Sequence, residues 1–128
     1  MLKMLKDEKF MIEFICFSLK ETISNLEENL RLNNHKSDPS LKAIEDIIKK
    51  YGIDKESAWS LYKPAFWYLS DKKIISYEGI SWKLNPEYQN PSKDILNKLA
   101  DDVLCSYRDT LDARLEKYIM MSETKAEK

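Results

Sequence analysis

The stretch LKAIEDIIKKYGIDKESAWSLYKPAFWYLSDKKIISYEGISWKLN, residues 41–85, decides the fold of this chain. Its first part places apolar residues at the three- and four-residue spacing of one helix face. Ser40 or Asp38 can cap that helix, and Gly52 can end it, because glycine readily adopts the left-handed conformation of a helix C-cap. We therefore predict a helix that ends near Tyr51 and a tight turn after it.

Two further helices are predicted in the middle of this stretch. Asp54 can cap a short helix that contains the sequence KESAWSLY. Pro64 has no backbone N–H to donate, so it is unfavourable inside a helix and well suited to a first turn. We therefore predict a break before Pro64 and a separate helix over residues 63–72, with Phe66 and Leu69 turned inward.

A β-hairpin is predicted at the end of the stretch. The pieces IIS and ISWKL contain β-branched and aromatic residues, and the sequence YEG lies between them. Glycine in a short connection between two such pieces is typical of a hairpin turn. Gly79 is therefore the expected turn residue.

Longer helices are predicted on both sides of this region. Residues 6–32 contain no Gly or Pro, and the first half of this segment is apolar on two sides. A final helix is predicted over residues 92–121, followed by a frayed polar tail over residues 122–128. The fold class is thus mainly α with a small β-hairpin, in a single domain of residues 1–128 whose core region spans residues 39–85.

The order of these elements resembles the winged helix-turn-helix family. In that family an apolar helix, a tight turn, a short helix and a recognition helix precede a two-stranded wing. Here YLSDKKII matches the end of the recognition helix, with Leu69 as its buried leucine and Ile74 and Ile75 at the start of the wing. Lys73 stands where the family often has glycine. The long flanking helices are similar to those through which MarR-like and PadR-like members dimerise.

The resemblance implies a dimeric DNA-binding protein, a small transcriptional regulator that binds double-stranded DNA. The doubly apolar first helix and the seven-residue spacing of apolar residues in the last helix also favour a homodimer. The expected dimer interface consists of Phe10, Phe14, Phe17, Leu104, Leu111, Leu115 and Tyr118.

Charge placement favours DNA as the partner. The chain has 21 basic and 22 acidic residues, a net charge of −1. Residues 49–83 nevertheless contain seven lysines against four carboxylates, so positive charge is concentrated where the resemblance places DNA contacts. Clustered lysines are also common on the solvated face of a lysine-rich protein. The residues expected to contact DNA are Lys55, Ser57, Lys63, Trp67, Ser70, Lys72, Lys73 and Lys83.

A protein partner is the alternative. The predicted recognition helix contains no Arg, Asn or Gln, although these side chains are frequent readers of base edges. It contains Trp67 and Tyr68 instead, and aromatic side chains are frequent anchors of protein–protein contacts. A winged-helix protein-interaction module, such as an adaptor or inhibitor subunit that does not bind DNA, fits these residues as well.

Catalysis is not expected. The only histidine, His35, lies in a polar loop, and Cys16 and Cys105 lie in apolar helical patterns typical of core positions. Two glycines cannot form a phosphate-binding loop. We therefore expect no enzyme activity, no cofactor and no bound metal. The apolar run at residues 10–19 is shorter than a membrane span and is not followed by a leader cleavage site, so we expect a cytoplasmic protein without membrane contact.

Overall fold

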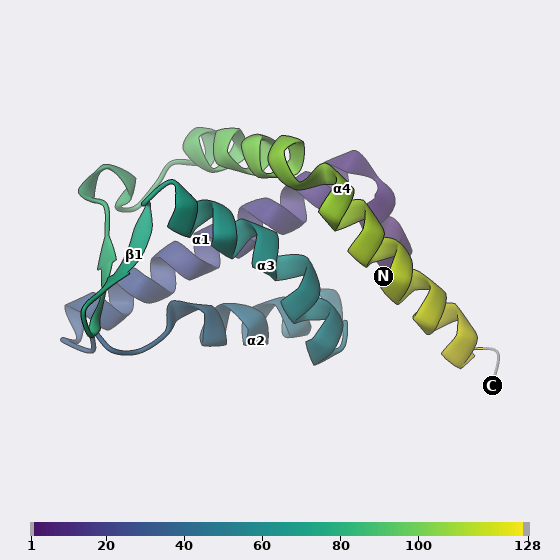
Figure 1. The fold of residues 1–128 in the computed structure, drawn as a ribbon, viewed down its shortest axis with the longest axis horizontal. Coiled ribbons are helices and arrows are strands. Elements are labelled where there is room, and N and C mark those ends of the chain that lie inside the picture. Colours follow the sequence, from purple (N-terminus) through teal and green to yellow (C-terminus); the bar gives the residue numbers. More distant parts are fainter. Residues whose placement is uncertain (1, 127–128) are drawn as a thin grey trace.

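The computed structural model describes the backbone of residues 2–126 and the side chains of residues 2–122 (Figure 1). Its helices are α1 (Glu8–Arg31), α2 (Pro39–Tyr51), α3 (Lys55–Asp71) and α4 (Lys93–Ala126), and its strands are β1 (Ile75–Glu78) and β2 (Ser81–Leu84). Short 3₁₀ helices over Leu2–Lys6 and Pro86–Tyr88 precede α1 and α4. The described chain is mainly helical with a small antiparallel hairpin, so the predicted fold class is confirmed at that level.

α1 is the helix on which the other helices pack. Figure 1 shows α1 running behind α3, with α2 below it and the first part of α4 above it. Its buried side carries large apolar side chains, among them Phe14, Leu19 and Ile23, which share one hydrophobic core with residues of α2, α3 and α4. Asp7 caps the helix, because its side chain accepts a hydrogen bond from the Lys9 N–H at 2.9 Å. Burial against three helices makes α1 the centre of the core.

α3 is one continuous helix, and the predicted break before Pro64 is wrong. A proline inside a helix leaves the carbonyl of the residue four positions earlier without its N–H donor. That carbonyl belongs to Ser60, and Arg114 Nη1 of α4 donates a hydrogen bond to it at 2.8 Å. A side chain from a distant part of the sequence thus replaces the missing donor, and α3 continues through Pro64 to Asp71.

The start of α3 follows the predicted turn and cap. Gly52 has φ +62° and closes α2, which leaves three residues between α2 and α3. The carboxylate of Asp54 accepts hydrogen bonds from the N–H and the hydroxyl of Ser57. The side chain of Ser57 is therefore buried and already paired inside the protein. For this reason the prediction that Ser57 contacts DNA is wrong.

The predicted hairpin is confirmed. β1 and β2 pair antiparallel, with Glu78 opposite Ser81 at the turn. Gly79 lies in the connection and has φ +66°, a conformation that glycine adopts without a steric penalty. The N–H of Trp82 donates a hydrogen bond to the carbonyl of His35 at 2.7 Å. The hairpin is therefore tied to the loop between α1 and α2.

α4 changes direction at Tyr107, where the backbone leaves the helical conformation (φ −123°, ψ 21°). The first part of α4 packs on α1, and the second part turns away from it and runs beside α3, as Figure 1 shows. The helix extends to Ala126, so the predicted frayed tail over residues 122–128 begins too early. Residues 127–128 of that tail lie outside the described part of the chain.

The kink changes the interpretation of the apolar residues on the two terminal helices. Five of the seven residues predicted to form a dimer interface are buried within one chain: Phe14, Leu104, Leu111, Leu115 and Tyr118. Both parts of α4 turn their apolar side toward their own chain, so the interface prediction is wrong for these residues. Phe10 and Phe17 are half-buried, and the homodimer itself stays a prediction. Cys105 is exposed, so its predicted core position is also wrong.

The hydrogen bond from Arg114 can be tested against Pro64 in a double-mutant cycle. Arg114→Ala leaves the Ser60 carbonyl without a donor, so we expect it to lower the free energy of unfolding by about 1–3 kcal/mol. Pro64→Ala restores the helical N–H, so in that background Arg114→Ala should cost about 1 kcal/mol less. Urea unfolding followed by circular dichroism measures all four proteins. An equal cost in both backgrounds would show that Arg114 stabilises the fold only through its other contacts.

Two carboxyl groups face each other where α1 meets α2. The pKa of Glu21 is raised from its ordinary value. The largest cause is partial burial, and a hydrogen bond to the Asp46 carboxyl and the negative charge of that carboxyl add to it. A carboxyl whose pKa is raised by folding stabilises the fold at pH values below its ordinary pKa. That contribution is lost as the pH rises through the raised value.

We therefore expect Glu21→Gln to raise the free energy of unfolding at about pH 7 and to leave it unchanged near pH 3. The gain should be about 0.2–0.5 kcal/mol, the usual size of a like-charge pair on helix surfaces. Urea titrations at the two pH values measure this difference, with Glu45→Gln, at an exposed position of α2, as the control. A gain that persists at the lower pH would rule out removal of charge as its cause.

Candidate interaction site on α3 and the hairpin

One side of α3 faces solvent. Trp59, Lys63, Phe66, Trp67 and Ser70 recur at a spacing of three and four residues, so they project from the same side of the helix. Lys63, Trp67 and Ser70 are exposed, whereas the two other aromatic residues are half-buried. The structure thus brings three of the residues predicted to contact DNA onto one accessible strip, which we call the α3 face.

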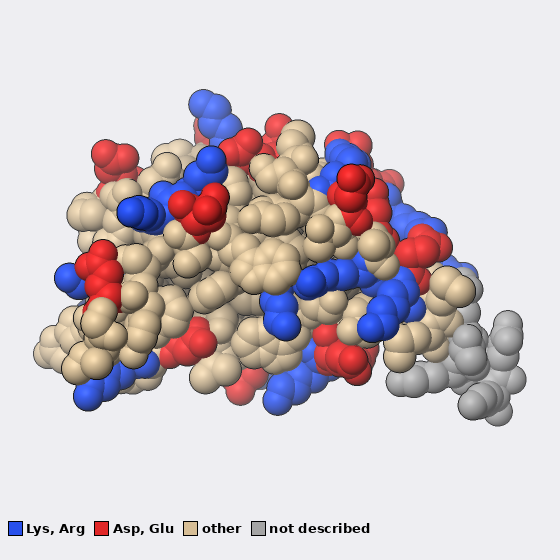
Figure 2. Space-filling view, in the orientation of Figure 1, with Lys and Arg blue, Asp and Glu red and all other residues tan. Residues whose placement is uncertain are grey.

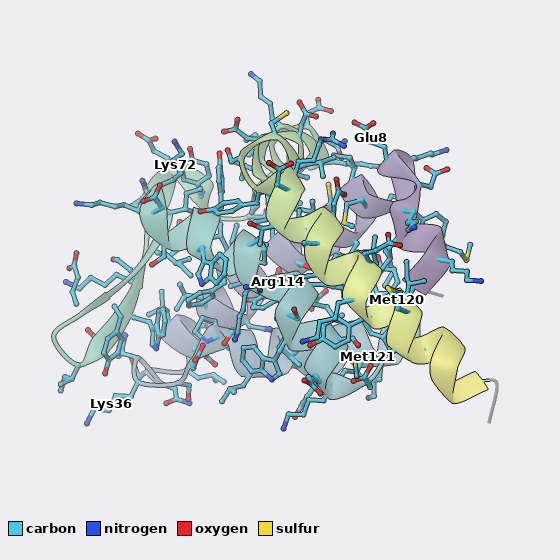
Figure 3. All side chains as sticks on the ribbon, turned by 45° about the vertical axis from the view of Figure 1, so that its right-hand side comes forward. Glu8, Lys36, Lys72, Arg114, Met120 and Met121 are labelled. Carbon is cyan, nitrogen blue, oxygen red and sulfur yellow. The ribbon has the colours of Figure 1, made fainter. Side chains whose placement is uncertain are left out.

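Trp67 is the most exposed aromatic residue of α3, with 38% of its surface accessible. The guanidinium of Arg114 lies 4.9 Å from its ring centroid, and the Tyr107 ring lies 6.0 Å from it. Figure 3 shows Arg114 on the side of α4 that faces α3. Tryptophan is the aromatic residue that attracts a cation most strongly. α4 therefore holds Trp67 in place while part of the indole stays accessible.

A row of aromatic contacts joins α3 to the hairpin. Phe66 lies between Tyr62 and Trp82, with ring centroids 6.2 Å and 5.9 Å away. Trp82 also contacts Tyr77 of β1, at a centroid distance of 5.1 Å. These separations are those of favourable tilted and edge-to-face ring pairs. The hairpin is therefore fixed relative to α3, and the α3 face continues onto Tyr77, which is more than half exposed.

Charges around the α3 face are of both signs. Figure 2 shows uncharged residues in the middle of this side of the molecule, with Lys, Arg, Asp and Glu interspersed around them. Lys83, a predicted DNA contact, forms an ion pair with Glu78 across the hairpin at 3.2 Å. A nucleic-acid site is usually marked by lysine and arginine clustered on one face. The side shown in Figure 2 does not have that distribution.

The remaining lysines predicted to contact DNA lie at the two ends of α3. Lys55 begins the helix, Lys72 and Lys73 follow its last residue, and all three are exposed. A helix of 17 residues is about 25 Å long. The structure therefore separates Lys55 from Lys72 and Lys73, and the Lys72 ammonium lies 5.9 Å from the centroid of the Tyr68 ring.

Tyr68 does not belong to the α3 face. Its side chain is buried, and its hydroxyl donates a hydrogen bond to a carboxylate oxygen of Asp102 on α4. Burial, followed by this hydrogen bond and the charge of Asp102, raises the pKa of Tyr68, so the hydroxyl stays a donor at neutral pH. Adjacent helical residues point about 100° apart, which is why Trp67 is exposed while Tyr68 faces α4. The predicted protein contact through Tyr68 is wrong.

Three residues of this site, Arg114, Tyr107 and Trp82, were not among the residues predicted from the sequence. Pro64 is the one feature of the sequence that could have indicated a residue such as Arg114. A proline inside a helix leaves a carbonyl, here that of Ser60, which needs a hydrogen-bond donor from elsewhere in the chain. Which donor reaches that carbonyl depends on where α4 turns. The kink at Tyr107 has no proline or glycine to announce it.

Two other kinds of site are not found in the part of the chain that the structure describes. No three His, Cys, Asp or Glu side chains come together there to hold a metal ion. None of the described helices combines the length and the apolar composition needed to cross a membrane.

Comparison of this chain with family models, with curated proteins and with solved structures finds no match. The geometry and chemistry of the α3 face therefore carry the functional proposal.

Proposed function

We propose that this chain is a winged-helix protein-interaction module that binds a partner protein through the α3 face. α2, the three-residue turn after it, α3 and the hairpin resemble the order of a winged helix-turn-helix, with the expected short helix and recognition helix joined in α3. The end of α3 also supports this assignment. Lys73 has φ +57°, its N–H donates to the Ser70 carbonyl, and the Ile74 N–H donates to that of Leu69. This is the Schellman arrangement, in which a glycine usually occupies the position of Lys73.

Trp67 beside Arg114 is the observation that carries the proposal. Tryptophan, tyrosine and arginine dominate the residues whose truncation weakens protein–protein contacts most. Arg114 is fixed by its hydrogen bond to Ser60, and the Trp67 ring is held by Arg114 and Tyr107. Little side-chain freedom remains to be lost when a partner covers Trp67.

The composition of α3 favours protein over DNA. The helix contains no Arg, Asn or Gln, so Lys63 and Ser70 are its only exposed polar side chains in the middle of the α3 face. The charges on this face are the cations Lys63 and, at its edge, Arg114. The partner surface that complements it has an apolar pocket for the indole of Trp67 and carboxylates opposite these cations.

Binding of double-stranded DNA is the second candidate. It is favoured by the excess of lysine over carboxylate in residues 49–83 and by the exposure of Lys72 and Lys73 at the end of α3. The lysines can neutralise phosphates without any base contact, so this candidate predicts weak sequence preference and a strong dependence on salt.

The two candidates are separated by one pair of measurements. Affinity purification of the tagged chain from cells that express it naturally should retain a stoichiometric partner, identified by mass spectrometry. Trp67→Ala should weaken the purified complex by about thirtyfold, because a tryptophan anchor contributes about 2 kcal/mol or more. Leu41→Ala, which removes an exposed apolar residue of α2 outside the α3 face, is the control and should leave the affinity unchanged.

A duplex-DNA shift assay at about 50 mM and 200 mM salt completes the test. The proposed function requires no retardation at either concentration. Retardation at the lower salt that is lost at the higher salt, and that Lys72→Ala with Lys73→Ala weakens, would replace the protein-binding proposal with DNA binding.

A further inference from the structure

A groove lies between the first turns of α1 and the start of α4, away from the α3 face. Its volume is about 910 Å³. Its floor is apolar and is made by Ile12, Cys16, Phe17 and Leu96. Ile12, Cys16 and Phe17 lie on the part of α1 that the other helices leave half-exposed. The doubly apolar start of α1 thus leaves one of its sides uncovered.

The rim of the groove is basic. Four lysines line it, Lys9 and Lys20 from α1, Lys50 from α2 and Lys93 from α4, against one carboxylate, that of Glu13. None of the four forms an ion pair with a described residue. The whole chain has a net charge of −1, so this concentration of positive charge is a local feature of the groove.

Contacts between its walls give the groove a fixed shape. The single proton of the Cys16 thiol can be donated to the side-chain oxygen of Asn97, 3.1 Å from the sulfur, or to the Leu96 carbonyl at 3.6 Å. On the other side, the Lys50 ammonium lies 4.5 Å from the centroid of the Phe17 ring. α2 and α4 are therefore both tied to α1 here, and a ligand need not order the walls when it binds.

We propose that this groove binds an acidic amphipathic helix of a partner protein. The lining residues of α1 recur at helical spacing from Lys9 to Lys20, a length of about 17 Å or three turns. A helix of similar length can lay an apolar stripe on the floor, as in other helix-in-groove complexes. Glutamates and aspartates beside that stripe then lie opposite the four lysines. A small ligand is a poorer fit, because small-molecule sites enclose most of the ligand surface.

The first measurement uses two synthetic peptides of about four turns that differ only in charge. One has leucine at helical spacing with glutamate elsewhere, and the other has lysine in place of every glutamate. Fluorescence anisotropy at low salt should show binding of the glutamate peptide and none of the lysine peptide. Equal binding of both peptides would overturn the proposal, because apolar contact with the floor alone would then explain the binding, without any selection by charge.

Variants locate the binding. The double variant Lys20→Glu with Lys93→Glu reverses one charge on each wall. It should lower the affinity for the glutamate peptide at least tenfold. Lys49→Glu with Lys98→Glu makes the same change in net charge at exposed lysines that do not line the groove. An equal loss in this control pair would overturn the assignment to the groove. Trp67→Ala should leave peptide binding unchanged, so the outcome is independent of the function proposed for the α3 face.

The two cysteines provide a second readout. Cys16 lies in the floor, and burial raises the pKa of its thiol, whereas Cys105 is exposed on α4. Bound glutamate peptide should slow alkylation of Cys16, followed by mass spectrometry, and leave Cys105 unaffected. Unchanged alkylation of Cys16 at saturating peptide would contradict the proposal.

Two other occupants are distinguished by the same variants. Sedimentation tests whether the parent chain is a dimer. A dimer that is lost in the double variant Lys20→Glu with Lys93→Glu would assign the groove to a second copy of this chain. Duplex DNA that binds the parent and not this variant would assign it to nucleic acid. Either result would overturn the proposal.

Discussion

The hydrogen bond from Arg114 to the carbonyl of Ser60 is the constraint on which the rest of this structure depends. Pro64 takes away the donor that this carbonyl would have in an ordinary helix. With Arg114 in that place, α3 stays one helix of 17 residues and the second part of α4 is held against it. The same guanidinium lies over Trp67, so one side chain both completes the fold and positions the proposed anchor.

The kink at Tyr107 allows α4 to serve two surfaces. Before the kink, Leu96 and Asn97 contact Cys16 and close one wall of the basic groove. After it, Arg114 and the ring of Tyr107 itself support Trp67. A straight helix of this length could not follow both α1 and α3, because these helices run in different directions (Figure 1). The change of direction is therefore what gives the chain two separate candidate docking surfaces.

Local signals in the sequence are sufficient to predict most helices and strands, but they are not sufficient to predict how these elements contact one another. The caps at Gly52 and Asp54 and the hairpin turn at Gly79 depend on neighbouring residues, and all three were predicted correctly. The continuity of α3 through Pro64 depends on a donor 54 residues away, which no local pattern contains. The apolar stripe of α4 has the same spacing whether it packs within a chain or between chains. Only the kink, which no proline or glycine marks, turns that stripe inward.

The two proposed surfaces differ in which interaction contributes most to binding. On the α3 face a tryptophan anchor contributes about 2 kcal/mol or more, whereas an exposed charge such as Lys63 contributes about 0.2–1 kcal/mol. In the proposed complex Trp67 therefore decides the affinity of the α3 face for its partner, and the charges adjust that affinity. In the groove, the apolar floor attracts an amphipathic helix of either sign. In the proposed complex the four lysines reject a basic helix, since they repel its like charges and attract the carboxylates of an acidic one. Aromatic anchoring on one surface and charge selection on the other suit two partners of different composition.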